Sequence, residues 1–155
     1  MGTQSNAQRE VQLLAEWITT LPPYFKAKTH VRVGQETLVF NGQVLTPARS
    51  RAMLAWSDWA DARIFTGSEV WIVEAKLVSV ATAYGQVLDY CDEYKECDDY
   101  KQFAPYPIVP VVLAAALKQR TANFFAPFGV RTVIFAPTWS LHSIATKIVG
   151  DLTGL

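Results

Sequence analysis

Two carboxylates and an amine are the residues of this chain whose types and spacing could do chemistry. The β-rich runs 60–65 and 70–77 flank four residues with turn chemistry, so we expect an antiparallel hairpin. A loop of that length opposes Asp61 to Glu74, and strand alternation puts Lys76 on the same face as Glu74. Opposed like charges destabilise a sheet. The spacing therefore predicts that a cation lies between the two acids.

Magnesium is the cation that this set of donors suits. Mg²⁺ binds carboxylate, carbonyl and water oxygens, and Mn²⁺ is expected to substitute for it. The carbonyl of Ala75, between Glu74 and Lys76, is a candidate third protein ligand. A metal held there could polarise a phosphoryl oxygen and lower the pKa of a bound water, while Lys76 orients or deprotonates that water. The predicted reaction is phosphodiester hydrolysis by in-line attack.

The same residues resemble a known family. Asp61, then twelve residues, then Glu74-Ala75-Lys76 at the end of an apolar strand that leads into a helix, is similar to the PD-(D/E)XK nuclease superfamily. The residue before Asp61 is Ala60 where the motif has proline. The likeness is to RecB-type nucleases and Holliday junction resolvases. It implies a restriction-endonuclease-like α-β-β-β-α-β core, a central mixed sheet flanked by helices, and an Mg²⁺-dependent endonuclease or exonuclease acting on DNA.

Three further site residues enter through this resemblance. RecB-type members carry a glutamine and a tyrosine four apart on the helix after the lysine, and Gln86 and Tyr90 match that pattern. Several members place an acid on the first helix, where Glu16 is the candidate metal ligand. Structural roles are the alternatives: a helix stripe with a packed tyrosine, and a solvated residue beside the apolar stripe of the helix. Strand alternation puts Arg63 on the same face as Asp61, and we expect Arg63 to compensate the acids rather than to contact phosphate.

The elements that must position these residues follow an α/β order, with an additional strand and helix after the predicted core. A capping box from Ser5 to Gln8 precedes a predicted helix at 6–20 whose apolar stripe is Val11, Leu14, Ala15 and Ile18. Asn41-Gly42 is a strong hairpin signal. The segment 47–59 could be a short helix or a loop. The other predicted elements are strands at 29–33, 37–40, 43–45, 108–115 and 130–136, a helix of about 16 residues from Ser79, a helix at 121–126, and a last helix capped by Ser140 and ending near Val149.

Charge and composition limit the partners that the chain can have. The 155 residues include 14 basic and 14 acidic ones, and 50% of the chain is hydrophobic, as expected for a single domain over 1–155. The segment 89–99 holds six acids and one base and is expected to be solvated, so the remaining 13 basic and 8 acidic residues give the rest a net charge of +5. Candidate DNA phosphate contacts are Lys26, Lys28, Arg32, Arg49, Arg51, Lys118 and Arg120.

No signal peptide or membrane span is apparent, which predicts a soluble, cytoplasmic protein, or a virion-associated one if the chain is phage-encoded. A domain of this size has little surface for gripping DNA, so we expect a homo-oligomer or docking on a larger protein assembly. The alternative is a catalytically quiet nuclease-fold module, such as a component of a phage particle or of a DNA-processing complex. The complete Asp61, Glu74 and Lys76 set favours the enzyme.

Overall fold

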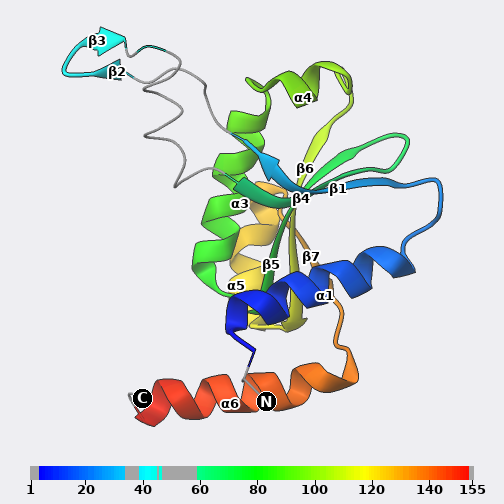
Figure 1. Ribbon diagram of the computed structural model, residues 1–155, viewed down its shortest axis with the longest axis vertical. Coiled ribbons are helices and arrows are strands. Elements are labelled where there is room, and N and C mark those ends of the chain that lie inside the picture. The colour runs from blue at the N-terminus through cyan, green and yellow to red at the C-terminus, as the bar shows by residue number, and fades with distance from the viewer. Residues whose placement is uncertain (1–3, 34–38, 45, 47–58, 154–155) are drawn as a thin grey trace.

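A mixed five-stranded sheet is the framework of the chain. The computed structural model describes residues 4–33, 39–44, 46 and 59–153. The strand order is β1-β4-β5-β6-β7, in which β1, β4 and β5 are antiparallel neighbours and β5, β6 and β7 run parallel (Figure 1). The predicted α/β fold with a central mixed sheet flanked by helices is confirmed. The strands are β1 (Lys26–Arg32), β4 (Trp59–Phe65), β5 (Val70–Val78), β6 (Ile108–Ala116) and β7 (Arg131–Ile134).

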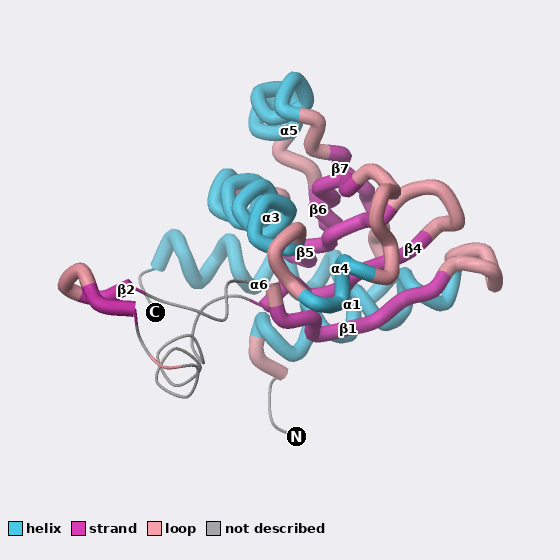
Figure 2. Tube along the Cα trace, turned by 90° about the horizontal axis from the view of Figure 1, so that it is seen from above, coloured by secondary structure: helices cyan, strands magenta, loops and turns pink. Residues whose placement is uncertain are grey.

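Different helices cover the two faces of this sheet (Figure 2). Helix α1 (Asn6–Thr20) buries Leu13 and Trp17 on one face, against apolar residues of β4, β5 and β6. Helix α3 (Ala81–Tyr94) packs on the other face, where its Tyr84 is fully buried. Removing these apolar side chains from water stabilises the fold by about 25 cal/mol per Å². None of the described helices is long and apolar enough to cross a membrane.

Two local signals of the sequence are confirmed, the capping box at Ser5 and the hairpin turn at Asn41-Gly42. The hydroxyl of Ser5 accepts the N–H of Gln8, and the side chain of Gln8 accepts the N–H of Ser5, so the predicted capping box starts α1. Asn41 and Gly42, with φ values of 49° and 74°, join the paired strands β2 (Val39–Phe40) and β3 (Gln43–Val44). Residues 37, 38, 45 and 47–58, which include Arg49 and Arg51, lie outside the described residues.

Other boundaries differ from the prediction. Helix α3 begins at Ala81 rather than Ser79, because the buried hydroxyl of Ser79 accepts the N–H of Lys118 at 2.7 Å and joins the ends of β5 and β6 instead. A short helix that was not predicted, α4 (Asp98–Lys101), lies within the acidic segment. Strand β1 starts three residues before the predicted strand at 29–33. The first residues of β1 are exposed, so a hydrophobic pattern in the sequence cannot reveal where this strand begins.

The C-terminal elements also shift by a few residues. Helix α5 (Gln119–Phe125) begins before residue 121 and continues into a 3-10 turn, η1 (Ala126–Phe128). Strand β7 is shorter than the predicted 130–136. Helix α6 (Thr138–Thr153) begins two residues before Ser140. Ser140 is not its N-cap, because its hydroxyl donates to the carbonyl of Pro137 at 2.7 Å.

Candidate active site

The pairing of β4 with β5 stops before β5 ends. It runs from Phe65–Val70 to Ala62–Val73, in the register predicted from the turn. Strand β5 continues beside β6 as far as Val78. Within the described residues, the second half of β5 therefore has a strand on one edge only, and a gap opens between it and β4.

Two carboxylates take the place of the missing strand. Asp61 Oδ2 accepts the backbone N–H of Ala75 at 2.8 Å, and Glu10 Oε1, from α1, accepts that of Leu77 at 3.4 Å. Both amides lie on the β4 side of β5, where a paired strand would have offered carbonyls. Because the N–H and C=O of one residue in a strand point to the same edge, the carbonyl of Ala75 faces the gap as well.

Strand alternation breaks where β1 and β4 pass this gap. Ala60 and Ala62 are two residues apart, yet they belong to opposite cores of the sheet. The pairing of β1 with β4 skips His30 and Asp61, and His30 has a φ of 53°, which is rare for a residue other than glycine. Asp61 therefore lies in a cavity beside α1, whereas Arg63 lies on the α3 face over the ring of Phe103. The prediction that Asp61 and Arg63 share a face is wrong.

Lys76 connects the acids of the gap. Its Nζ is 2.8 Å from Glu74 Oε1 and 3.8 Å from Glu10 Oε2. The side chain of Glu74 is only 6% exposed, and its Oε2 is buried without a hydrogen-bond partner in the described part of the chain. Buried polar atoms are paired in the great majority of cases, so this oxygen marks a place where a donor or a cation is missing. We call the four residues Glu10, Asp61, Glu74 and Lys76 the acidic gap.

Three carboxylates surround one ammonium group in the acidic gap. Burial and this excess of negative charge shift the pKa values of Glu74, Asp61 and Lys76. Burial, followed by the charge of Asp61, raises the pKa of Glu74 to about 7. Burial also raises the pKa of Asp61, although the N–H of Ala75 and the charge of Lys76 oppose the shift. For Lys76, burial alone would lower the pKa, but the hydrogen bond from Lys76 to Glu74 and the nearby negative charges outweigh it. The pKa of Lys76 is therefore raised, and a further cation would relieve the remaining negative charge.

A cavity of about 560 Å³ opens beside the acidic gap. Glu10, His30, Asp61 and Lys76 line it together with apolar residues of α1. The volume falls in the range of small-molecule sites, so a phosphodiester with an adjacent sugar can reach these side chains. Among the described residues, no group of three His, Cys, Asp or Glu side chains is arranged to hold a metal ion. Mg²⁺ needs fewer, because it is commonly bound by one or two carboxylates and keeps several waters.

Three predicted site residues lie away from the gap. Gln86 is exposed on α3, and Tyr90 is half-buried and packs against the core on the α3 side. Glu16 accepts the indole N–H of Trp139 at 3.1 Å from both carboxylate oxygens, so it holds α6 to α1. The acid that α1 brings to the gap is Glu10.

Glu10 could have been found from the phase of the helix. The predicted stripe placed Val11 in the core, but Val11 is 66% exposed and the buried stripe is Leu13, Leu14 and Trp17. Glu10 precedes these residues by three, four and seven positions, so it occupies a core-facing position of α1. His30 was also missed, because the change of face at φ 53° leaves no trace in the sequence pattern.

Arg63 pairs with an acid outside the gap. Its Nε donates to Asp99 Oδ2 at 2.9 Å and its Nη2 donates to Oδ1 at 3.1 Å. Arg63 thus compensates an acid, as predicted, but the acid is Asp99. This also corrects the expectation that the whole segment 89–99 is solvated, since the side chain of Asp99 is only 13% exposed.

The acidic gap can bind a cation, offer an ammonium group to an anion and admit a small polar substrate. Its carboxylates are poor sites for an anion on their own, because negative charge is already in excess. A phosphoryl group therefore needs a cation between itself and these acids. Comparison with known proteins adds no relative, since no family model, no curated protein and no solved structure matches the chain.

Proposed function

We propose that the chain is a magnesium-dependent nuclease that hydrolyses DNA phosphodiester bonds at the acidic gap. The element order supports this: apart from the separate β2–β3 hairpin and the short helix α4, the elements α1, β1, β4, β5, α3 and β6 follow the α-β-β-β-α-β order of the nuclease superfamily that the sequence resembles. In this order the acids and the lysine lie on the central strands of the sheet and on the helix that covers it. We propose the restriction-endonuclease-like core on the same grounds.

The buried, unpartnered Oε2 of Glu74 is the observation that carries the proposal. A carboxylate whose second oxygen lacks a donor is costly unless a ligand supplies the missing interaction. Glu74, Asp61 and the carbonyl of Ala75 would hold Mg²⁺, since all three offer the hard oxygen donors that this ion prefers. When bound, the ion would polarise a phosphoryl oxygen and lower the pKa of a coordinated water.

The chain's own groups have distinct tasks in this proposal. Lys76, held by Glu74 at 2.8 Å, presents an ammonium group that orients a water or stabilises negative charge on the phosphoryl oxygens. Asp61 and Glu10 fix the edge of β5 through the N–H groups of Ala75 and Leu77. These contacts hold the backbone on either side of Glu74 and Lys76 in place without using the side chain of Glu74. The site is therefore preorganised before a ligand binds.

Basic residues at the same end of the sheet support DNA as the substrate. Strands β5 and β6 run parallel, and Lys118 and Arg120 follow directly after β6. Both are exposed. Their side chains would contact phosphates on either side of the cleaved bond. Two exposed cations give a weak grip on a duplex, so we further propose that a second copy of the chain or a larger assembly completes the DNA contact.

A cleavage assay tests the proposal. Supercoiled plasmid, linear duplex, single strands and branched junctions are incubated with the protein and Mg²⁺, Mn²⁺ or EDTA. We expect cleavage with either metal and none with EDTA. Glu74→Gln keeps the shape of the side chain and should lower the cleavage rate at least about 100-fold, the scale seen when a key electrostatic group is removed.

Asp92→Asn is the matched control, because it removes the same charge from a side chain that is 84% exposed on α3. It should cleave at the parent rate. Cleavage by Glu74→Gln at the parent rate would exclude the acidic gap as the active site. No cleavage of any substrate by the parent would favour the interaction module over the enzyme.

A further inference from the structure

A second cavity, lined by residues of β1, β4 and the segment around α4, shares His30 with the cavity beside the acidic gap. We propose that this cavity binds an unpaired nucleobase of the strand whose phosphodiester occupies the acidic gap. The inference rests on the nuclease function proposed above and deepens it. It specifies a substrate that has unpaired nucleotides beside the cleaved bond.

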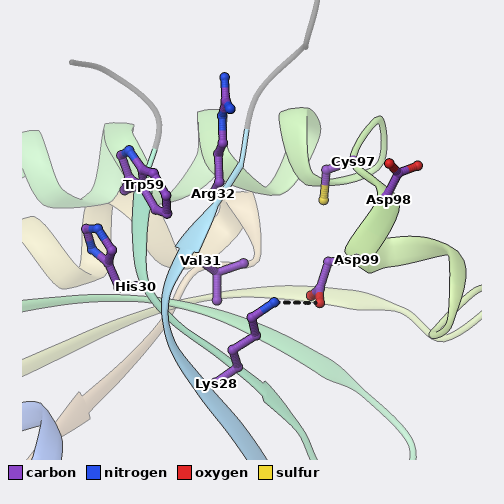
Figure 3. A pocket seen from close by; sticks show the side chains of 8 residues that line it. All are labelled: Lys28, His30, Val31, Arg32, Trp59, Cys97, Asp98 and Asp99. Atoms are coloured by element: carbon purple, nitrogen blue, oxygen red, sulfur yellow. Dashed lines mark hydrogen bonds and ion pairs between the residues drawn. The ribbon is translucent and has the colours of Figure 1, made fainter. Parts of the chain in front are cut away.

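The cavity has a volume of about 300 Å³, and its residues come from two parts of the chain that are far apart in sequence. His30 and Trp59 form one side of it, and residues of the acidic segment at α4 form the other (Figure 3). This volume lies at the small end of ligand sites and is enough for one base with part of its sugar. We call it the stacking cavity, and its charged and ring-bearing lining residues are Lys28, His30, Arg32, Trp59, Asp98 and Asp99.

An aromatic pair open to solvent is the main feature of the stacking cavity. The rings of His30 and Trp59 lie 4.2 Å apart at an interplanar angle of 7°, so they are stacked. Trp59 is 36% exposed and His30 is exposed. Stacked aromatic rings with an accessible surface are how proteins hold unpaired bases, because every base has a π-face.

The stacking cavity is connected to the acidic gap through His30. This residue lines both cavities, because its φ of 53° lets it leave the regular strand geometry of β1. In the cavity beside the acidic gap, His30 shares the lining with Asp61 and Lys76. One nucleotide step of a strand that passes along His30 would thus place a base on the aromatic pair and the adjacent phosphate toward Asp61 and Lys76.

The charges of the stacking cavity favour a base over a phosphate. Its two cations, Lys28 and Arg32, are matched by the carboxylates of Asp98 and Asp99, so the lining has no net positive charge to attract a phosphate. A phosphate would lie beside these two carboxylates, whereas a neutral base avoids the repulsion. Both acids have protein partners, Lys101 for Asp98 and Arg63 for Asp99, so the cavity has no need of a bound cation.

A base in a duplex has both faces covered by its neighbours, so it cannot stack on His30 and Trp59 without leaving the helix. Unstacking costs free energy, and it costs least where the base is already unpaired. The stacking cavity therefore favours single strands, overhangs, flaps or junction arms over blunt duplex.

Binding is measured by fluorescence anisotropy of labelled DNA with Ca²⁺ in place of Mg²⁺, because the acidic gap needs a cation before it can accept a phosphate. The probes are an oligothymidylate of about 12 nucleotides, an abasic strand of the same length, and a blunt duplex. We expect the parent to bind the oligothymidylate more tightly than either other probe. Trp59→Ala should weaken oligothymidylate binding about tenfold and leave abasic-strand binding unchanged, because stacking needs a base.

The variants are matched to the local backbone. His30→Asn removes the ring but keeps a residue type that tolerates positive φ, which alanine does not, and it should weaken oligothymidylate binding as well. Tyr24→Ala is the control, since Tyr24 is an aromatic residue that is 68% exposed and lines neither cavity. Thermal unfolding of each variant shows whether the fold is retained.

The outcomes separate this inference from the proposed function. If the parent cleaves DNA but folded Trp59→Ala binds all three probes as the parent does, the stacking cavity is refuted and the nuclease stands. If the parent cleaves nothing but prefers the oligothymidylate through Trp59, the base site stands and the nuclease fails. Equal weakening of the oligothymidylate and abasic probes by Trp59→Ala would also overturn base stacking.

Discussion

Two ionic clusters, one around Asp99 and Arg63 of β4 and one around Glu74 of β5, differ in how completely they are paired. Asp99 accepts hydrogen bonds on both carboxylate oxygens, from Arg63, Tyr94 and Gln102, and Lys28 lies 3.3 Å from it. Glu74 has Lys76 on one oxygen and no partner for the other in the described part of the chain. Both carboxylates are largely buried, so exposure does not explain the difference.

The pKa values of the two acids move in opposite directions. Burial alone would raise the pKa of Asp99, but the hydrogen bonds from Arg63 and Tyr94 hold it below its usual value. Burial and a neighbouring acid raise the pKa of Glu74 to about 7. A fully paired cluster stabilises the fold, whereas an incompletely paired one leaves room for a ligand. We therefore expect the Asp99 cluster to be structural and the Glu74 cluster to be a binding site.

The largest expected effect comes from breaking the complete cluster. Asp99→Ala leaves the guanidinium of Arg63, whose side chain is 8% exposed, without its carboxylate. Breaking a buried pair in this way typically costs about 3–5 kcal/mol, so we expect a loss of about 3 kcal/mol in the free energy of unfolding. Urea denaturation at pH 7 measures it. A loss below about 1 kcal/mol would show that the pair behaves as an exposed one.

The equivalent change in the incomplete cluster should have the opposite sign. The pKa of Glu74 is raised from 4.5 to about 7 in the folded chain, so the folded state binds this proton more tightly than the unfolded state does. That contribution to stability is full below about pH 4.5 and is lost as the pH rises through 7. Glu74→Gln removes the loss and should be more stable than the parent by about 2–3 kcal/mol at pH 8 without metal.

At pH 4.5 the two proteins should unfold at nearly the same denaturant concentration. Urea curves at a series of pH values between 4.5 and 8 give the difference directly. A Glu74→Gln variant that is less stable than the parent at pH 8 would mean that the pair with Lys76 outweighs the burial of the charge.

Metal should stabilise the incomplete cluster alone. A ligand present at ten times its dissociation constant raises the free energy of unfolding by about 1.4 kcal/mol if it binds only the folded state. Mg²⁺ should therefore raise the melting temperature of the parent and of Asp92→Asn, but not that of Glu74→Gln. An equal response of all three proteins to Mg²⁺ would place the ion elsewhere.

The smallest expected effect comes from Glu16, and it tests which acid of α1 belongs to the acidic gap. Glu16→Gln keeps an oxygen that can accept the indole N–H of Trp139, so stability should change by less than about 1 kcal/mol. Its cleavage rate should equal that of the parent. Glu10→Gln, six residues earlier on the helix, should lower the cleavage rate, since its carboxylate contacts Lys76 and the edge of β5. The reverse result in the plasmid assay would restore Glu16 as the helix ligand.

The part of the site that depends on the turn between β4 and β5 could be predicted from the sequence. The four-residue loop after Phe65 fixes the register of β4 with β5, and register alone brings Asp61, Glu74 and Lys76 into one neighbourhood. The prediction extended this register as a regular ladder to Asp61, but there the alternation of β4 changes. This change involves His30 on another strand, so the pattern of β4 by itself could not reveal it.

The remaining contacts depend on packing between segments far apart in the chain. Arg63 and Asp99 are separated by 36 positions and meet because α4 lies against the β1–β4 side of the sheet. Glu16 and Trp139 are 123 positions apart. Local periodicity cannot encode such pairs. It also left the buried face of α1 uncertain, because Leu14 belongs both to the predicted apolar stripe and to the stripe that is buried in the structure.

The two carboxylates that cap β5 also protect the chain from self-association. An interrupted strand pairing exposes backbone amides to which any extended segment could add, and such edges are a common route to aggregation. Here the amides of Ala75 and Leu77 already donate to Asp61 and Glu10. An incoming strand would have to displace both acids and bring its own carbonyls against their charge. The protein can therefore keep an opening in the middle of its sheet without recruiting a foreign strand to close it.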